Sequence, residues 1–337
     1  MAQPDKLDRI STKRVKLMIT FACTLILYAA FLSGVSLYVS AQDLKKATFS
    51  QVSDAASHTV FEHLDDYTTL LYSGIALLEA KPDATQEDWA TYFTTLNALT
   101  RYPGTSTISY VKVAYPGDET YLQGRFKELP DYTGSTQFTG VPDDGEMHGY
   151  LTMYVAGYSL ASAIGFDGIN STPDRQTLYR AAAASASPVS SSTLTFATGR
   201  EGFIVALPHA ENGVLQGYVV VSFQNSEVFA NLLNNKSIML AYQVSDTTNE
   251  TTLYTSDNWD SRDEQFVRSV TVDLGQRTLK LTIHPEASQN NLSDFIPSAI
   301  AISCGVIAAA ILWAAGYRHI KRVQQSPPQA DQQKPLQ

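Results

Sequence analysis

The chain has 337 residues, a formal net charge of −9 and two cysteines. An acidic chain without a run of basic residues argues against nucleic acid as a partner. Two cysteines cannot build a disulfide scaffold or a four-thiolate metal site. With 44% hydrophobic and 17% charged residues, the composition also excludes a chain that is disordered throughout.

Two segments without a charged residue, 17–41 and 295–317, lie near the two ends of the chain. Each is longer than the roughly 20 apolar residues that cross a bilayer. The flanking tails are basic, whereas residues 42–294 carry 15 basic and 30 acidic side chains. Because basic flanks favour the cytoplasm, we expect a multi-pass protein of the plasma or inner membrane. Both termini, 1–16 and 318–337, are expected in the cytoplasm and residues 42–294 outside. The alternative is that the first segment is a cleaved signal peptide.

Residues 42–100 are expected to form a stalk helix followed by a short helix. Apolar or small side chains recur every three or four residues from Val52 to Leu78, which is typical of an amphipathic helix, and Pro82 ends it. A second helix is predicted over 86–99, with Thr85 as its N-cap. A long apolar stripe needs a covering partner, so we expect a homodimer through the stalk helix.

Beyond residue 100, strand and turn patterns alternate with short helices. A hydroxyl cap followed by Pro173 predicts a helix that continues to Ala184, and Asn212-Gly213 and Gly275-Gln276 predict tight turns. The remaining predicted elements are strands at 107–113, 201–207, 216–223, 238–244, 251–255, 266–274 and 278–284, an apolar run at 150–160, a surface loop at 127–149 and a helix at 226–234. This order predicts an α+β fold with a larger lobe over 101–223 and a smaller lobe over 224–290.

The order of several short motifs resembles the CHASE domain family, the extracytoplasmic sensors of histidine kinases and nucleotide cyclases. The motifs are Tyr102-Pro103-Gly104, Gly165-Phe166-Asp167, Pro173-Asp174-Arg175, Ser190-Ser191, Gly202-Phe203-Ile204-Val205 and Gly217-Tyr218-Val219-Val220. His209 stands where the family usually has Val after the Pro of the late strand. The resemblance implies two tandem PAS-like lobes outside the membrane, of which the membrane-distal lobe binds a small molecule.

The candidate ligand-binding residues combine the motif positions with polar groups beside the expected pocket. Tyr hydroxyls on a pocket wall suit a heteroaromatic ligand, and Ser191 and Thr193 are expected to share one face of a strand. The candidates are Tyr154, Tyr158, Asp167, Arg175, Ser191, Thr193 and Phe203. The alternative for each is a structural role, in core packing or in holding the fold.

No catalytic constellation is recognisable, so we expect neither an enzyme nor a bound cofactor. The six histidines are scattered, and His58 and His63 are five residues apart, which does not place them on one helix face as a metal pair. The tail 318–337 is too polar to bury a core and is expected to be disordered, without an effector domain.

These features predict a transmembrane sensor that binds a small molecule outside and signals to a separate membrane or cytoplasmic effector. Two alternatives stay open: the chain is a fragment of a longer receptor, or it is a membrane-anchored solute-binding or envelope-interaction protein that does not signal.

Overall fold

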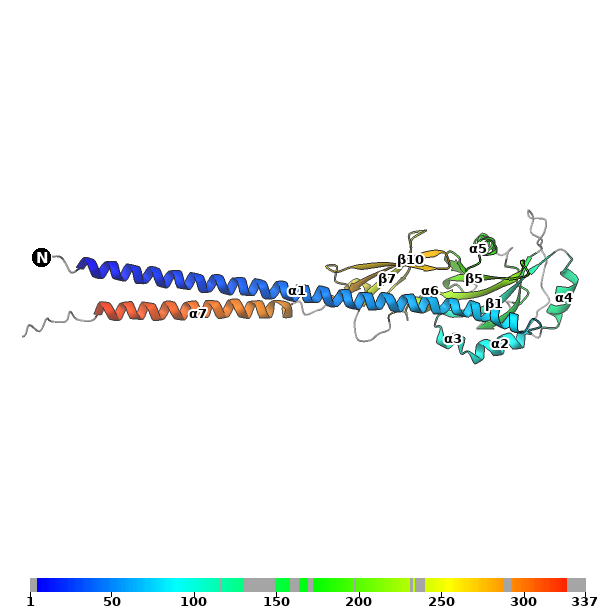
Figure 1. Ribbon diagram of the computed structural model, residues 1–337, viewed down its shortest axis with the longest axis horizontal. Helices are drawn as coiled ribbons and strands as arrows, with labels where there is room; N and C mark the ends of the chain where they lie inside the picture. Colours follow the sequence, from blue (N-terminus) through cyan, green and yellow to red (C-terminus); the bar gives the residue numbers. More distant parts are fainter. Residues whose placement is uncertain are drawn as a thin grey trace, which may run out of the picture. The chain divides into compact units, whose positions relative to one another are not determined.

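The computed structural model forms two compact units, one from Met1–Thr48 with Ser288–Gln337 and one from Phe49–Ala287. The first unit is helical, and the second contains two antiparallel sheets (Figure 1). The structure describes residues 5–115, 117–129, 149–157, 164–168, 172–196, 198–230, 233, 240–287 and 292–325.

Helix α1 (Asp5–Ala80) ends two residues before Pro82, as the sequence predicts. Its predicted apolar stripe is buried at Val60, Leu64 and Leu71, in one core with side chains from both sheets. The chain's own sheets therefore cover the stripe that was expected to need a second copy. The homodimer stays a prediction, and the apolar stripe of α1 no longer supports it.

The helical unit pairs the first part of α1 with α7 (Leu292–Gln325). Both helices contain a stretch long and apolar enough to cross a membrane. The two helices approach closely at two glycines of α7. A Cβ on Gly305 would overlap Ala30, and a Cβ on Gly316 would overlap Ile19. Small residues at such contacts are typical of helices that pack within a bilayer. The two-pass topology itself stays a prediction.

Two short helices, α2 (Gln86–Thr95) and α3 (Ala98–Arg101), connect α1 to the first sheet. Thr85 caps α2 as predicted and forms a capping box with Asp88. The helix ends earlier than the predicted residue 99, because Asn97 adopts a left-handed conformation with φ 52°. Helix α4 (Glu119–Lys127) was not predicted from the sequence.

The larger sheet has the order β2-β1-β6-β5-β3, and β4 also pairs with β5. Its strands are β1 (Thr105–Ala114), β2 (Gly149–Gly157), β3 (Val189–Ser190), β4 (Leu194–Thr195), β5 (Glu201–Glu211) and β6 (Val214–Gln224). Side chains alternate between two faces, as on any strand. Phe203 and Val205 join the core under α1 and α2, whereas Ile204 and Ala206 join a second core with helix α5 (Pro173–Ala183). Figure 1 shows α5 on the opposite side of this sheet from α2 and α3.

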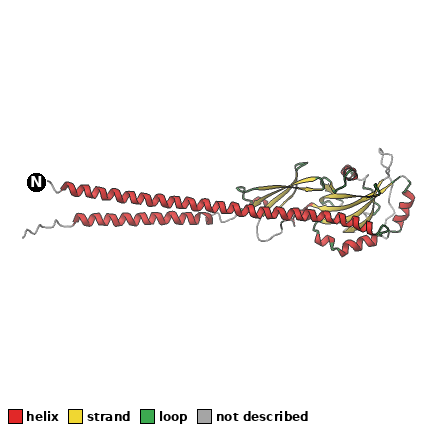
Figure 2. Ribbon diagram, in the orientation of Figure 1, coloured by secondary structure: helices red, strands yellow, loops and turns green. Residues whose placement is uncertain are grey.

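The smaller sheet follows helix α6 (Asn225–Ala230) and has the order β8-β7-β10-β9. Figure 2 shows the strands of both sheets in yellow. It consists of β7 (Leu240–Asp246), β8 (Thr251–Thr255), β9 (Arg268–Leu274) and β10 (Arg277–Pro285), with the short helix η1 (Trp259–Ser261) before β9. Strand β10 is an inner strand and is the last one before α7. The predicted α+β class is confirmed, while the PAS-like nature of the two lobes and their residue limits stay predictions.

Candidate functional site

The predicted ligand-binding residues lie in three separate places in the structure. Tyr158 is outside the described residues. Tyr154 lies on the face of the larger sheet that α2 covers. Asp167 and Arg175 lie around the start of α5. The third group lies at the junction of the two sheets. That group consists of Ser191, Thr193 and Phe203. Whether any of these side chains binds a ligand stays a prediction.

Tyr154 is buried in an aromatic cluster between β2 and α2. Its ring lies 6.0 Å, centroid to centroid, from the rings of both Tyr110 and Trp89. The hydroxyl donates a hydrogen bond of 2.6 Å to the carbonyl of Ala84. Burial raises the pKa of Tyr154, while Arg125 acts in the opposite direction. This side chain therefore attaches the connection between α1 and α2 to the larger sheet.

The start of α5 positions Arg175 beside an aromatic ring. Thr172 caps the helix by accepting a hydrogen bond from the Arg175 amide, and Pro173 occupies the first turn, as predicted. The guanidinium lies 5.0 Å from the centroid of Phe166, a cation–π distance. The Thr152 amide donates to the Phe166 carbonyl at 3.1 Å, which holds this segment against β2.

The region between β3 and β4 differs from the predicted continuous strand. Strand β3 ends at Ser190 and β4 begins at Leu194. The Ser191 amide still donates to the carbonyl of Ile204, but the Ile204 amide donates to the Ser191 hydroxyl instead of to its carbonyl. The Ser191 carbonyl is thereby turned away from the strand ladder.

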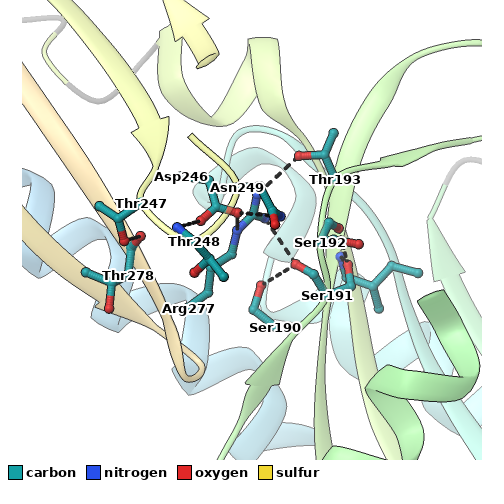
Figure 3. A network of polar contacts seen from close by, with 11 residues as sticks. Ser190, Ser191, Ser192, Thr193, Asp246, Thr247, Thr248, Asn249, Arg277 and Thr278 are labelled. Atoms are coloured by element: carbon teal, nitrogen blue, oxygen red, sulfur yellow. Dashed lines mark hydrogen bonds and ion pairs between the residues drawn. The ribbon is translucent and has the colours of Figure 1, made fainter. Parts of the chain in front are cut away.

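The freed carbonyl accepts a hydrogen bond of 3.1 Å from Nη1 of Arg277, the first residue of β10 (Figure 3). Nη2 of the same guanidinium donates to the Thr193 hydroxyl at 3.1 Å. The guanidinium also lies 5.8 Å from the ring of Phe203. Arg277 thus contacts all three predicted residues at this junction, although it comes from the other sheet.

Asp246, at the end of β7, balances the charge of Arg277. Its Oδ2 lies 2.7 Å from Nε of Arg277, and both side chains are almost fully buried, with exposures of 1% and 5%. Burial opposes ionisation of this carboxylate. The hydrogen bond from the Thr248 amide and the charge of Arg277 outweigh burial and keep the pKa of Asp246 below its ordinary value. The pair is therefore ionised at neutral pH.

Sequence reasoning missed both Arg277 and Asp246. They are 31 positions apart, and 86 positions separate Arg277 from Ser191. In the sequence, Arg277 and Asp246 read as surface residues, because a charged residue beside a tight turn is normally exposed to solvent. A buried pair of this kind is defined only when the two sheets meet.

A groove of about 400 Å³ lies at the end of the β5–β6 hairpin. Its polar lining includes Glu79, Ser185 and His209. Nδ1 of His209 lies 3.2 Å from the Tyr110 hydroxyl. Burial lowers the pKa of His209. Among the described residues, no group of three or more His, Cys, Asp or Glu side chains could hold a metal ion.

Comparisons with known proteins identify the family. The CHASE domain model matches residues 82–254, from the α1–α2 connection to β8. This is more than half of the chain, which therefore belongs to the CHASE domain family. Asp246 lies within the matched region and Arg277 beyond it. A comparison with curated proteins found no significant match.

Solved structures give only distant similarities. The chain is 12% identical to the ligand-binding domain of the amino acid chemoreceptor PctC of Pseudomonas aeruginosa in complex with GABA, with a TM-score of 0.43 over 71% of this chain and 99% of that one. It is 13% identical to the ligand-binding domain of the chemoreceptor CtaA of Pseudomonas fluorescens in complex with L-serine, with a TM-score of 0.42 over 73% and 98%. With scores this low, the family assignment rests on the family model alone.

Proposed function

We propose that this chain is a transmembrane sensor that binds a small molecule in its larger lobe. The signal would pass through the smaller lobe to the second membrane-spanning helix. The observation that carries the proposal is the match of the CHASE domain model to residues 82–254. The two long apolar helices on either side of this domain support a signal that crosses the membrane.

The architecture of the larger lobe favours it over the smaller lobe as the ligand-binding part. Its sheet has a buried core on each face, one under α1 and α2 and one under α5. A ligand can be enclosed between a sheet and the elements that cover it, and such enclosure is what small-molecule sites require. On the α5 side, the predicted ligand-binding residue Arg175 is half-buried. Its guanidinium lies beside the exposed ring of Phe166.

Thermal shift of the purified full chain in detergent tests ligand binding. The library contains adenine derivatives, amino acids, carboxylates and sugars. A ligand at about a hundred times its dissociation constant adds about 2.7 kcal/mol, which raises the melting temperature by about 4–5 °C for a protein of this size. If no compound in the library raises the melting temperature, an interaction with another protein becomes the favoured function.

Two variants of α5 make the test specific to the proposed site. Arg175→Ala is expected to abolish the shift caused by a hit. Arg180→Ala removes an exposed arginine from the same helix and is expected to leave the shift intact. Equal shifts in both variants would place the ligand elsewhere.

The signalling step separates a sensor from a protein that only binds a solute. Cys304 is exposed on α7, and Cys23 is buried on α1. In a Cys23→Ser variant, a nitroxide on Cys304 is expected to change its mobility when the hit is added. An unchanged spectrum with confirmed binding would favour the solute-binding alternative.

We also propose that both termini are cytoplasmic, that two copies associate and that a separate membrane or cytoplasmic effector receives the signal. Crosslinking of the full chain in membrane vesicles tests the association. A species of twice the monomer mass is expected, and a purely monomeric pattern at all crosslinker concentrations would contradict the homodimer.

A further inference from the structure

The smaller lobe contacts the larger lobe through the turn between β9 and β10. Gly275 and Gln276 form this turn with φ values of 54° and 67°, as in a two-residue hairpin. The Gly275 carbonyl accepts a hydrogen bond of 2.6 Å from the Ser190 amide. Nε2 of Gln276 donates to the Ser185 hydroxyl at 2.9 Å. The turn therefore continues the edge of the larger sheet at β3.

Arg277 follows the turn immediately and divides its hydrogen bonds between the lobes. Nε binds Asp246 within the smaller lobe, whereas Nη1 and Nη2 bind Ser191 and Thr193 of the larger lobe (Figure 3). All three nitrogens are engaged, and the group is shielded from water. A buried charge that loses its partners is expensive, so an arrangement in which only some of these contacts form is disfavoured.

The position of Arg277 in β10 connects this junction to the end of the sheet. Strand β10 pairs with β7 on one side and with β9 on the other over most of its length. Its last residue is Pro285, and α7 begins at Leu292. Arg277 itself pairs with Leu274 of β9, and its side chain binds Asp246 of β7. A displacement of Arg277 therefore acts on both strands that flank β10.

We propose that Arg277 is a positioning residue that couples the two lobes. It holds segment 191–193 in the conformation in which the Ser191 carbonyl points out of the strand ladder. A change in that segment is thereby passed to β10 and, through it, to α7. The statement that a ligand causes this change rests on the proposed function, whereas the coupling between lobes does not.

A double-mutant experiment on the full chain in lipid nanodiscs tests the coupling without a ligand. Leu281 is a buried core residue of β10, and its truncation destabilises the smaller lobe. In the native background, Leu281→Ala is expected to speed hydrogen exchange in peptides covering residues 189–196 by about tenfold or more. In the Arg277→Met background, the same truncation is expected to leave exchange in those peptides nearly unchanged.

A matched control uses the ion pair between Arg268 and Asp54, whose N–O distance is also 2.7 Å but whose side chains are half exposed. Arg268→Met is expected to preserve the response to Leu281→Ala. If Arg277→Met also preserves it, Arg277 only stabilises the fold and the proposal is wrong. If Arg277→Met does not fold, Thr193→Val decides, because it removes one acceptor and retains side-chain volume. A response unchanged in Thr193→Val would then overturn the coupling.

The outcome is independent of the ligand screen. A preserved response in the Arg277 variant rejects the coupling and leaves ligand binding in the larger lobe to be judged by thermal shift. A lost response combined with a silent ligand library supports the coupling and removes support from the proposed sensor function.

Discussion

The two lobes use the same antiparallel pairing but bury their sheets differently. Strands β5 and β6 of the larger lobe are buried over five or six consecutive residues, because cores cover both faces of the sheet. Strand β9 of the smaller lobe alternates between exposed and buried residues toward its end, as expected for a sheet with one covered face. A sheet covered on both faces can enclose a ligand. In the proposed function, the larger lobe therefore encloses the ligand and the smaller lobe connects it to the rest of the chain.

The largest expected difference between the lobes concerns their tryptophans. Trp89 is fully buried under the larger sheet and donates its Nε1–H to the Ile108 carbonyl. Trp89→Ala is expected to lower the free energy of unfolding by about 3–5 kcal/mol. Trp259 of the smaller lobe is half-buried, with Arg262 over its ring, and Trp259→Ala is expected to cost about 1–2 kcal/mol. Urea unfolding of both variants checks the ratio, and equal losses would contradict the contrast.

Breaking the buried ion pair of the smaller lobe, at its junction with the larger lobe, is expected to have the next largest effect. Asp246→Asn leaves the Arg277 charge buried without a counter-charge and is expected to cost about 3 kcal/mol. Because the pKa of Asp246 is lowered by folding, the stabilisation is complete above the ordinary aspartate value of about 3.9. It is lost as the pH falls below that value through the folded pKa. Unfolding measured between pH 7 and pH 2 should lose this acid-dependent component in the variant.

Removing the hydroxyl that interrupts the strand should have a smaller effect. In Ser191→Ala, the Ile204 amide loses its side-chain acceptor, and the backbone carbonyl of residue 191 is free to return to the strand ladder. We expect a loss of about 1–3 kcal/mol and a longer distance from that carbonyl to Arg277. A crystal structure of the variant measures the distance, and an unchanged contact would exclude this explanation of the break between β3 and β4.

The smallest expected effect is the pH response of His209 in the groove of the larger lobe. Burial lowers its pKa, and Lys112 acts in the same direction, while Glu79 and Glu211 partly oppose them. The unfolded chain therefore binds the proton more readily, and stability should fall as the pH drops below about 6.5 toward the folded pKa. The slope cannot exceed about 1.4 kcal/mol per pH unit for one proton. His209→Val is expected to flatten the curve in this range, whereas an identical curve would assign the slope to other groups.

The sequence by itself determined several helix ends, caps and turns, and it determined the family. Pro82 ends α1, Thr85 and Thr172 cap α2 and α5, and the turns at Asn212-Gly213 and Gly275-Gln276 connect the strands as predicted. These features depend on residues a few positions apart, so backbone preference and local hydrogen bonding are sufficient to define them. The order of the CHASE motifs likewise requires no three-dimensional information.

Only the tertiary structure decided what each side chain contacts. The Tyr154 hydroxyl donates to the Ala84 carbonyl, 70 positions away in the sequence, a contact that no local pattern indicates; its place on a pocket wall stays a prediction. Arg277 and Asp246 had no recognisable role until two sheets enclosed them beside Ser191. The physical reason is that burial and pairing of polar groups depend on desolvation by distant parts of the chain, whereas local sequence patterns report only backbone preference and amphipathicity.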